Sequence, residues 1–307
     1  MADFRNKAEG FDNPTQLPTT QHERERWIKA NKQWWESHPM RYDFSAPLNA
    51  SQEFSEEFYK EIDKRFFDSA RCYAPWKRIP FDTMIDFDSL ASKRVLEIGV
   101  GNGSHALLLA QHAKEFVGID LTEYAVKSTK RRMETFGVRN ARILQMSAES
   151  LEFPDNCFDV VWSWGVIHHT ADTSAALREI YRVLKPGGSA TIMVYYRSFW
   201  GTYVAAGFFL GVLKGYWLKE KSLHRIVQRT TDGAIARFYG LSEWGKMVAD
   251  AGLKVERAQV TGQKTDLILL PASKIKNAIL DLIPNSVGRF FTNTCRMGQF
   301  LVSTLRK

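Results

Sequence analysis

The sequence predicts a doubly wound α/β domain whose sheet is mostly parallel. Between residues 93 and 195, short apolar runs typical of buried strands alternate with single segments of helical periodicity. Because parallel strands need crossover connections and such crossovers are right-handed, this alternation places the strands side by side with helices on the sheet faces. A glycine-rich turn between the first strand and the first helix adds a feature of ligand-binding α/β sheets.

Seven segments have the composition of strands: Arg94–Ile98, Glu115–Asp120, Ala141–Met146, Phe158–Ser163, Ser189–Val194, Leu253–Val260 and Gln299–Thr304. Four segments have helical periodicity: Ser104–His112, Thr122–Phe136, Thr173–Leu184 and Ser242–Ala251. Pro186 and Gly187 end the third of these helices, because proline cannot continue a helix. The parallel strands therefore precede residue 195, and the last two strands complete the sheet near the C-terminus.

Less regular segments flank these strands. Gln21–Ser37 and residues 51–71 have the periodicity of helices, and Pro39 breaks the chain between them. The expected division of the chain is a mobile arm at 1–20, an N-terminal helical lid at 21–90, a ligand-binding core at 91–195, an inserted helical cap at 196–240, and a completion of the sheet at 241–307 with an insertion at 261–297.

The net charge of +8 is unevenly distributed along the chain. Residues 196–307 contain 17 Lys and Arg against 7 Asp and Glu, a local balance of +10, whereas the first 195 residues have a balance of −2. A basic C-terminal third suits an anionic membrane surface, a nucleic acid or an acidic substrate. A basic face that only contacts solvent is an equally open interpretation.

The cysteines and the start of the chain indicate the compartment. Cys72, Cys157 and Cys295 are far apart and form no CxxC pair, which argues against a disulfide framework, a structural zinc ion or an iron–sulfur cluster. The first ten residues, MADFRNKAEG, contain no apolar stretch of the kind found in secretory signals. We therefore expect a cytoplasmic protein.

A glycine-rich turn is the sharpest motif in the sequence. The segment VLEIGVGNGSHALLLA places Gly99, Gly101 and Gly103 between a buried strand and a helix. Glycine lets the backbone turn tightly there and lets a ligand approach the N-terminus of the helix. The spacing differs from the dinucleotide-binding pattern G-x-G-x-x-G, which expects glycine where Ser104 stands, and no P-loop lysine follows.

Two carboxylates accompany this turn. Glu97 lies two residues before the first glycine, where it suits an amine-bearing ligand better than a pyrophosphate. Asp120 ends the second strand, where a carboxylate can accept hydrogen bonds from both hydroxyls of a ribose. Together they indicate a ribose-bearing ligand without phosphates rather than NAD.

Four motifs in this order resemble those of class I S-adenosylmethionine-dependent methyltransferases. They are VLEIGVGNGSHALLLA, VGIDLTEYAV, AESLEFPDNCFDVVWSWGVIHH and ALREIYRVLKPGGSATIMVYYR. The likeness covers residues 90–197 and is greatest to the type 11 group, which includes ubiquinone- and menaquinone-biosynthesis and other small-molecule methyltransferases. It implies a seven-stranded Rossmann-like sheet, S-adenosyl-L-methionine as cofactor, and a small-molecule methyl acceptor.

The resemblance also implies roles for individual residues. Glu97 and the three glycines would border the methionine part of the cofactor, while Asp120 would bind the ribose and Leu121 would pack on the adenine. The expected cofactor-binding residues are Glu97, Gly99, Gly101, Gly103, Asp120, Leu121, Ala148, Glu149, Ser163 and Trp164. Tyr42 is a further predicted cofactor-binding residue, which does not depend on the resemblance. It is predicted because the segment HPMRYD can fold over the cofactor as a lid.

Residues after the fourth and fifth strands are the candidates for the chemistry. His168 and His169 follow the fourth strand, and a histidine can take a proton from a hydroxyl or a carbon acid near neutral pH. The alternative is that this pair only packs or caps the next helix. Tyr195, Tyr196 and Arg197 end the fifth strand and are candidate substrate contacts, but no aspartate stands there to form a dyad with a histidine.

Several other functions are disfavoured. SWGVIHH stands where nucleic-acid methyltransferases that act on exocyclic amines have D/N-P-P-Y/F, which argues against a nucleic-acid substrate. No clustered acidic ligands indicate a metal site, and the scattered cysteines do not suggest a thiolate relay. The alternative from another class is a non-catalytic S-adenosylmethionine-binding partner subunit. A damaged cofactor motif would indicate that alternative, yet Glu97, the glycines and Asp120 are all present.

The segment FWGTYVAAGFFLGVLKGYWL, at 199–218, is a long apolar helix candidate with one interior lysine. It can cap the acceptor pocket, lie peripherally on a membrane through 199–225, or form an oligomer contact through Gly207, Gly211 and Gly215. A membrane span is the least favoured interpretation. We favour the cap, whose apolar lining would suit a lipophilic acceptor. Its walls would be Phe199, Trp200, Phe208, Phe209 and Trp217.

Overall fold

The computed structural model describes residues 7–42, 48, 53–229, 231–269 and 273–307. Its centre is an eight-stranded sheet in the order β3-β2-β1-β4-β5-β8-β7, with β6 paired to β5. The strands are β1 (Arg94–Ile98), β2 (Glu115–Asp120), β3 (Ala141–Gln145), β4 (Phe158–Trp164), β5 (Leu184–Tyr196), β6 (Phe238–Tyr239), β7 (Lys254–Thr261) and β8 (Phe300–Arg306). Strand β8 runs antiparallel to both β5 and β7, and every other strand pair is parallel.

The predicted doubly wound sheet is confirmed. All seven expected strands are present, and their bounds differ from the expected ones by a few residues. The eighth strand, β6, was not predicted, because a two-residue strand is too short to show the alternation on which strand prediction depends.

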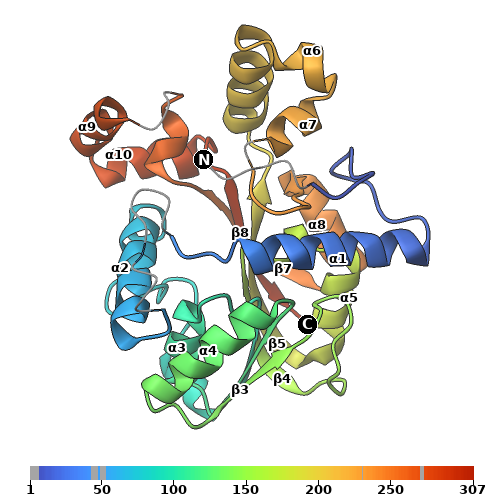
Figure 1. Cartoon of the computed structure of the whole chain (residues 1–307). Helices are drawn as coiled ribbons and strands as arrows, with labels where there is room; N and C mark the ends of the chain where they lie inside the picture. Colours follow the sequence, from blue (N-terminus) through green and yellow to red (C-terminus); the bar gives the residue numbers. More distant parts are fainter. Residues whose placement is uncertain (1–6, 43–47, 49–52, 230, 270–272) are drawn as a thin grey trace.

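Helices cover both faces of the sheet (Figure 1). On one face lie α2 (Glu56–Tyr73), α3 (Ser104–Ala110) and α4 (Glu123–Thr135), and on the other lie α5 (Thr173–Val183) and α8 (Leu241–Asp250). Helix α1 (Gln21–Ser37) crosses the edge where the parallel strands end. One hydrophobic core fills each face, and each fully buried aliphatic side chain contributes about 1.5–3 kcal/mol.

Side-chain caps fix where two of the helices begin. The Thr122 side chain accepts a hydrogen bond from the backbone N–H of Ala125 at the start of α4, and Asp172 does the same for Ala175 at the start of α5. Such caps stabilise a helix by about 1 kcal/mol. Because α4 follows β2 directly, its cap also sets the position of the loop at the end of β2.

The segment before α1 packs against the protein, which corrects the mobile arm expected at 1–20. Ala8 and Phe11 are buried, and the Phe11 ring lies edge-on to Trp27 at 5.4 Å. The backbone N–H of Ala8 donates to Ala234 O at 3.0 Å. Residues 1–6 lie outside the described residues. Composition alone missed this docking because part of the contact, such as the bond to Ala234, is with residues more than 200 positions away in the sequence.

Two helical modules project beyond the edge where the parallel strands end (Figure 1). The first module follows β5 and contains η4 (Phe199–Leu213), α6 (Tyr216–Glu220) and α7 (Leu223–Gln228). The second module follows β7 and contains η5 (Lys264–Leu267), α9 (Lys274–Leu282), α10 (Asn285–Arg289) and η6 (Phe290–Thr294). Within the described part of the chain, no helix combines the length and the hydropathy that crossing a membrane requires.

Candidate functional site

A cavity of about 960 Å³ opens at the edge where the parallel strands end. Parallel strands bring their C-terminal ends to one edge, and α/β sheets bind their ligands there. The wall of this cavity combines the ends of β1, β2, β4 and β5 with α1, the segment after α1, α2, the start of α3, and the loop after β7. It therefore joins regions that are far apart in the sequence.

The three glycines of the turn serve different purposes. At Gly99, a Cβ atom would lie 2.2 Å from Cγ2 of Val166, so this glycine permits close packing inside the protein. At Gly101, where φ is +52°, a Cβ atom would meet nothing within 4 Å, and the residue lines the cavity. Gly103 does not line the cavity, which corrects its assignment as a ligand contact. It starts α3 at φ +80° and packs against Thr129.

Glu97 is buried in the wall of the cavity, and its Oε2 atom has no hydrogen-bond partner. Burial raises the pKa of Glu97 well above its usual range, and the nearby carboxylate of Asp120 raises it further. An unpaired buried carboxyl oxygen is costly, and a cationic ligand group is the partner that would relieve this cost. The free site is therefore complementary to an ammonium group.

Asp120 joins the glycine turn to the start of α4. Its Oδ2 accepts a hydrogen bond from the Gly101 N–H at 3.1 Å, and its Oδ1 accepts from the N–H and the hydroxyl of Thr122 at 3.0 and 2.8 Å. Burial raises the pKa of Asp120, while these hydrogen bonds oppose the shift. Asp120 lines the cavity, as Leu121 does after it, so the carboxylate both shapes this loop and faces the ligand space.

Ala148 and Glu149 contribute to the same region of the wall. Both carboxylate oxygens of Glu149 are already engaged by the protein. One accepts a hydrogen bond from the Ala171 N–H at 2.7 Å, and the other pairs with Nη1 of Arg24 at 2.9 Å. Glu149 therefore connects α1 to the sheet in addition to lining the cavity.

The segment after α1 covers the ligand loop, and Tyr42 lies in the cavity wall as the lid prediction expects. Two of the contacts that hold this lid join it to the glycine turn and to α4. The side-chain amide of Asn102 donates to Met40 O at 2.7 Å. The Glu36 carboxylate accepts hydrogen bonds from the backbone N–H groups of Glu123 and Tyr124, each at 2.9 Å. A carboxylate is favoured at a helix N-terminus, so Glu36 fastens the lid to α4.

His169 also lines the cavity, and one of its ring nitrogens has no hydrogen-bond partner. Its Nδ1 lies 2.6 Å from Ile235 O, and because a carbonyl only accepts, Nδ1 carries the proton. Its Nε2 therefore holds a lone pair, and this atom is buried without a partner. Burial lowers the pKa of His169, opposed by the carboxylate of Asp232. The wall thus contains a neutral, oriented imidazole.

Asp232 supplies the carboxylate that the end of β5 lacks in the sequence. The Tyr195 hydroxyl donates to Oδ1 of Asp232 at 2.7 Å, and both residues line the cavity. Burial and this carboxylate raise the pKa of Tyr195 well above its usual value, so the phenol stays protonated. The Asp232 loop is braced by Lys7, whose Nζ donates to Thr231 O and Gly233 O at 2.7 Å each.

Four expected site residues after the strands lie outside the cavity wall, and these assignments are corrected. Ser163 is fully buried in β4, whose neighbouring side chains alternate between the two sheet faces. His168 is also fully buried, and its ring packs on Tyr195 with centroids 3.9 Å apart. Tyr196 packs against a hydrophobic core, and Arg197 pairs with Glu243 at 2.7 Å. Of the paired histidines, the cavity wall contains His169.

Many wall residues were not indicated by the sequence, and four of these are Asn31, Trp35, His105 and Asp232. Asn31 and Trp35 project from α1, and the Trp35 ring lies edge-on to His169 at 4.9 Å. His105 accepts a hydrogen bond from the Trp162 indole at Nδ1, which leaves its Nε2–H without a partner. Asp232 is the fourth. The sequence did offer a signal for His105, which is a polar residue on the inner side of the first turn of α3. Asn31, Trp35 and Asp232 reach the wall through long-range packing, for which the sequence offers no signal.

The segment 199–218 contributes no residue to the cavity wall, which corrects the expected cap. Helix η4 leads away from the sheet edge, and α1 with the segment after it covers the cavity instead. The apolar segment acts on the wall only indirectly. The Trp200 indole donates to Asp266 O at 2.9 Å, beside Thr265, which lines the cavity.

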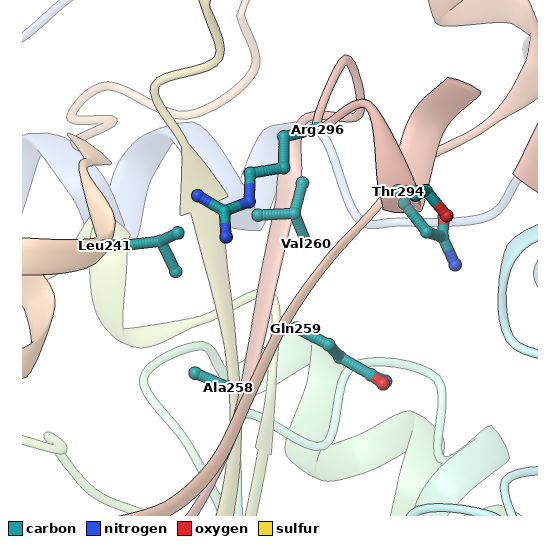
Figure 2. A pocket seen from close by; sticks show the side chains of 7 residues that line it. Leu241, Ala258, Gln259, Val260, Thr294 and Arg296 are labelled. Atoms are coloured by element: carbon teal, nitrogen blue, oxygen red, sulfur yellow. The ribbon is translucent and has the colours of Figure 1, made fainter. Parts of the chain in front are cut away.

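A second hollow of about 360 Å³ lies between β7 and η6 at the edge of the sheet (Figure 2). Its lining is Leu241, Ala258, Gln259, Val260, Asn293, Thr294 and Arg296. Arg296 is the single ionisable side chain of this lining, so the hollow lacks a paired acid and base. It shares no residue with the large cavity. Within the described residues, no cluster of His, Cys, Asp and Glu is suited to a metal ion.

Comparison with known proteins places this site in a family. Residues 96–192 match the family described as "Methyltransferase domain". The chain is 39% identical over 106 residues to the uncharacterized methyltransferase YcgJ of Bacillus subtilis, covering 34% of this chain and 42% of that protein. It is 34% identical over 122 residues to the demethylmenaquinone methyltransferase of Thermus thermophilus, covering 39% and 54%. The protein YafE of Escherichia coli is 30% identical over 158 residues, covering 52% and 68%.

The fold agrees with these matches. A chain from the Haloferax volcanii complex of the Trm112 methyltransferase activator with a methyltransferase superposes with a TM-score of 0.50 at 18% identity, over 85% of this chain and 99% of that one. The present chain spans about half the length of the first curated relatives that it matches. It belongs to the class I S-adenosylmethionine-dependent methyltransferases, whose cofactor is S-adenosyl-L-methionine.

Proposed function

We propose that this protein transfers a methyl group from S-adenosylmethionine to a small lipophilic or aromatic acceptor, with His169 as the general base. One observation carries the proposal: a single cavity is lined both by Glu97, Gly101 and Asp120 and by His169, whose buried Nε2 has no hydrogen-bond partner. The proposal thus gives this one cavity a cofactor end at Glu97 and an acceptor end at His169. Enclosure matters because methyl transfer requires the two reactants to be aligned away from water.

The residues of the first end fit the cofactor of the family. Glu97 offers an unpaired carboxyl oxygen to the amino group, and Gly101 leaves open space beside the turn. Asp120 and Leu121 suit the ribose and the adenine, and Tyr42 lines the same cavity from the lid. When bound, S-adenosylmethionine supplies an activated methyl group on a sulfonium centre.

The residues of the second end suit an acceptor with an acidic proton. His169 Nε2 can remove a proton from a hydroxyl or a carbon acid, and the Ile235 carbonyl holds the ring in the required tautomer. The neighbouring Asp232 carboxylate favours the imidazolium that forms. Trp35 and Trp164 give this end an aromatic lining, which favours an apolar or aromatic acceptor.

A screen of methyl acceptors tests the proposed function. The protein is incubated with methyl-labelled S-adenosylmethionine and with hydroxyl, amine, carbon and thiol acceptors, including quinone precursors of the kind named by the Thermus thermophilus relative. We expect transfer to a lipophilic hydroxyl or carbon acceptor. Tight cofactor binding without transfer to any acceptor would instead favour a non-catalytic partner subunit. The three cysteines are free thiols, in keeping with the proposed cytoplasmic location.

Cofactor affinity is expected to rise with pH through the titration of Glu97. Because the pKa of this carboxyl is raised in the free protein, the group is protonated below that pKa and cannot pair with an ammonium group. Cofactor affinity should fall by up to about tenfold for each pH unit below the pKa of Glu97. Binding of the cofactor should release the proton of the Glu97 carboxyl. Calorimetry in two buffers of different ionisation enthalpy measures both effects. The Glu97→Gln variant should bind weakly with a flat pH dependence, whereas an unchanged slope in that variant would contradict the assignment.

A further inference from the structure

Both helical modules beyond the sheet edge expose large apolar side chains. In the first module, Phe199 is 73% exposed and Leu218 is 84% exposed. In the second module, Ile275 is 70% exposed and Leu282 is 83% exposed. Contiguous apolar surface of this kind marks a site of interaction, because leaving it in water is unfavourable.

The exposed residues of α9 form one stripe. Ile275, Ile279 and Leu282 follow the spacing i, i+4, i+7, so they lie on the same side of the helix. Leu280 is buried and turns toward the protein. Helix α9 is therefore amphipathic, but its apolar stripe faces away from the protein. The stripe has no partner among the described residues.

The exposed residues of η4 also share one side. Phe199, Tyr203, Phe208 and Val212 are exposed at intervals of four, five and four residues. This interval fits the wide winding of η4, a π-helix with i→i+5 hydrogen bonds such as Lys214 N–H to Phe209 O. Two separate helices, which both lie beyond the same edge of the sheet (Figure 1), thus carry exposed apolar side chains.

Cations accompany the apolar surface of the first module. Lys214, Lys219 and Lys221 are exposed, and none of them makes an ion pair with the described residues. These lysines belong to the segment whose balance of charge is +10 over 196–307. Apolar side chains flanked by free cations are complementary to an anionic bilayer, which offers both a hydrocarbon region and negative headgroups.

Both modules begin at the rim of the cavity. The first module starts immediately after β5, whose Tyr195 lines the cavity. The second module starts at η5, where Thr265 lines the cavity, and its Lys264 donates to Leu280 O at 3.0 Å. The indole of Trp200 links the two modules through Asp266 O. The apolar stripes therefore extend outward from the rim of the acceptor end.

We propose that the two modules together dock this protein on an anionic lipid surface, so that a lipophilic acceptor enters the cavity from the bilayer. The choice of a lipophilic acceptor rests on the proposed function, whereas docking itself does not. The free lysines argue for lipid over a second copy of the chain, because two identical basic surfaces would repel each other. A dimer formed through these stripes is the competing outcome of the test.

Vesicle flotation tests the docking. The protein is mixed with vesicles of phosphatidylcholine alone or with phosphatidylglycerol added, without cofactor or acceptor. We expect binding to the anionic vesicles that weakens by about tenfold or more between about 0.05 and 0.5 M salt, because the cations are screened. The double variant Leu218→Asp/Leu282→Asp should lower the vesicle partition coefficient by about tenfold or more, because the exposed apolar surface of each module then carries a charge that the bilayer interior excludes. The Leu17→Asp variant, which changes an exposed leucine outside both modules, should bind like the wild type.

Two further measurements separate the competing outcomes. Sedimentation without lipid reports the oligomeric state, and a dimer abolished by Leu218→Asp/Leu282→Asp would overturn the proposal in favour of a second copy. Equal vesicle binding by the wild type and the double variant would overturn it as well, as would absence of binding at low salt. Calorimetric binding of S-adenosylmethionine should be unchanged in the double variant. If the acceptor screen fails while flotation succeeds, the docking stands and only the proposed function is rejected.

Discussion

Replacing Gly101 by valine is expected to weaken the binding of S-adenosylmethionine by about 100-fold or more, which corresponds to about 2.7 kcal/mol. The Gly101 position opens directly to the cavity, so a side chain there would take the space of the ligand. A β-branched residue at φ +52° also strains the turn, in which the Gly101 N–H donates to Oδ2 of Asp120. Isothermal titration calorimetry of the folded variant measures the effect.

Gly137 provides a matched control for this substitution. It has a φ of +68°, a Cβ atom there would also meet nothing within 4 Å, and it does not line the cavity. Gly137→Val should therefore show the cost of backbone strain while leaving cofactor affinity close to that of the wild type. Equal affinity losses in both variants, or unchanged affinity in folded Gly101→Val, would show that the turn does not hold the cofactor.

Replacing His169 by asparagine is expected to lower turnover by about 10²–10⁴-fold while cofactor affinity stays the same. The asparagine amide can still donate to Ile235 O, as Nδ1 of the imidazole does, but it provides no base at the position of Nε2. The measurement is kcat with the acceptor found in the screen, together with calorimetric cofactor affinity. His168→Asn is the matched variant, because His168 is equally buried and lies outside the cavity wall. A similar loss of turnover in both variants would indicate packing rather than proton transfer.

The pH profile gives an independent test of His169. The neutral imidazole is the base, and burial lowers its pKa, so the active form persists below the ordinary histidine pKa of about 6.5. We expect kcat/KM to be flat above pH 7 and to fall as pH decreases through the lowered pKa. The sequence alone suggested a limb near neutrality, and the burial of the ring moves it to lower pH. His169→Asn should remove this limb, and its persistence would assign the limb to another group.

The sheet and the cofactor end follow from local sequence. Strands β1 and β2 occupy the residues that hydrophobic runs predict, and the loops after them must meet because parallel strands end at one edge. Glu97, Gly101, Asp120 and Leu121 therefore line one cavity. The hydrophobic pattern of each strand and the parallel topology are therefore enough to place residues at the ends of neighbouring strands.

The acceptor end depends on contacts that no local pattern encodes. Asp232 reaches Tyr195 across 37 residues, and its loop is held by Lys7 from the other end of the chain. Trp35 reaches His169 from α1, for which the sequence predicts a helix but not the contacts that the helix makes. Such contacts arise when separate elements pack around a shared core, so periodicity within one element cannot reveal them.

The sequence by itself determined the fold class, the cofactor family and which residues surround the glycine turn, because these depend on periodicity and on short spacings. It also identified 199–218 as too apolar to remain in water. Only the tertiary structure decided that α1 covers the cavity and that 199–218 lies outside it. It also decided which of the paired histidines lines the cavity. The physical reason is that helix and strand formation are governed by nearby residues, whereas the direction in which an apolar face turns depends on every surface available to cover it.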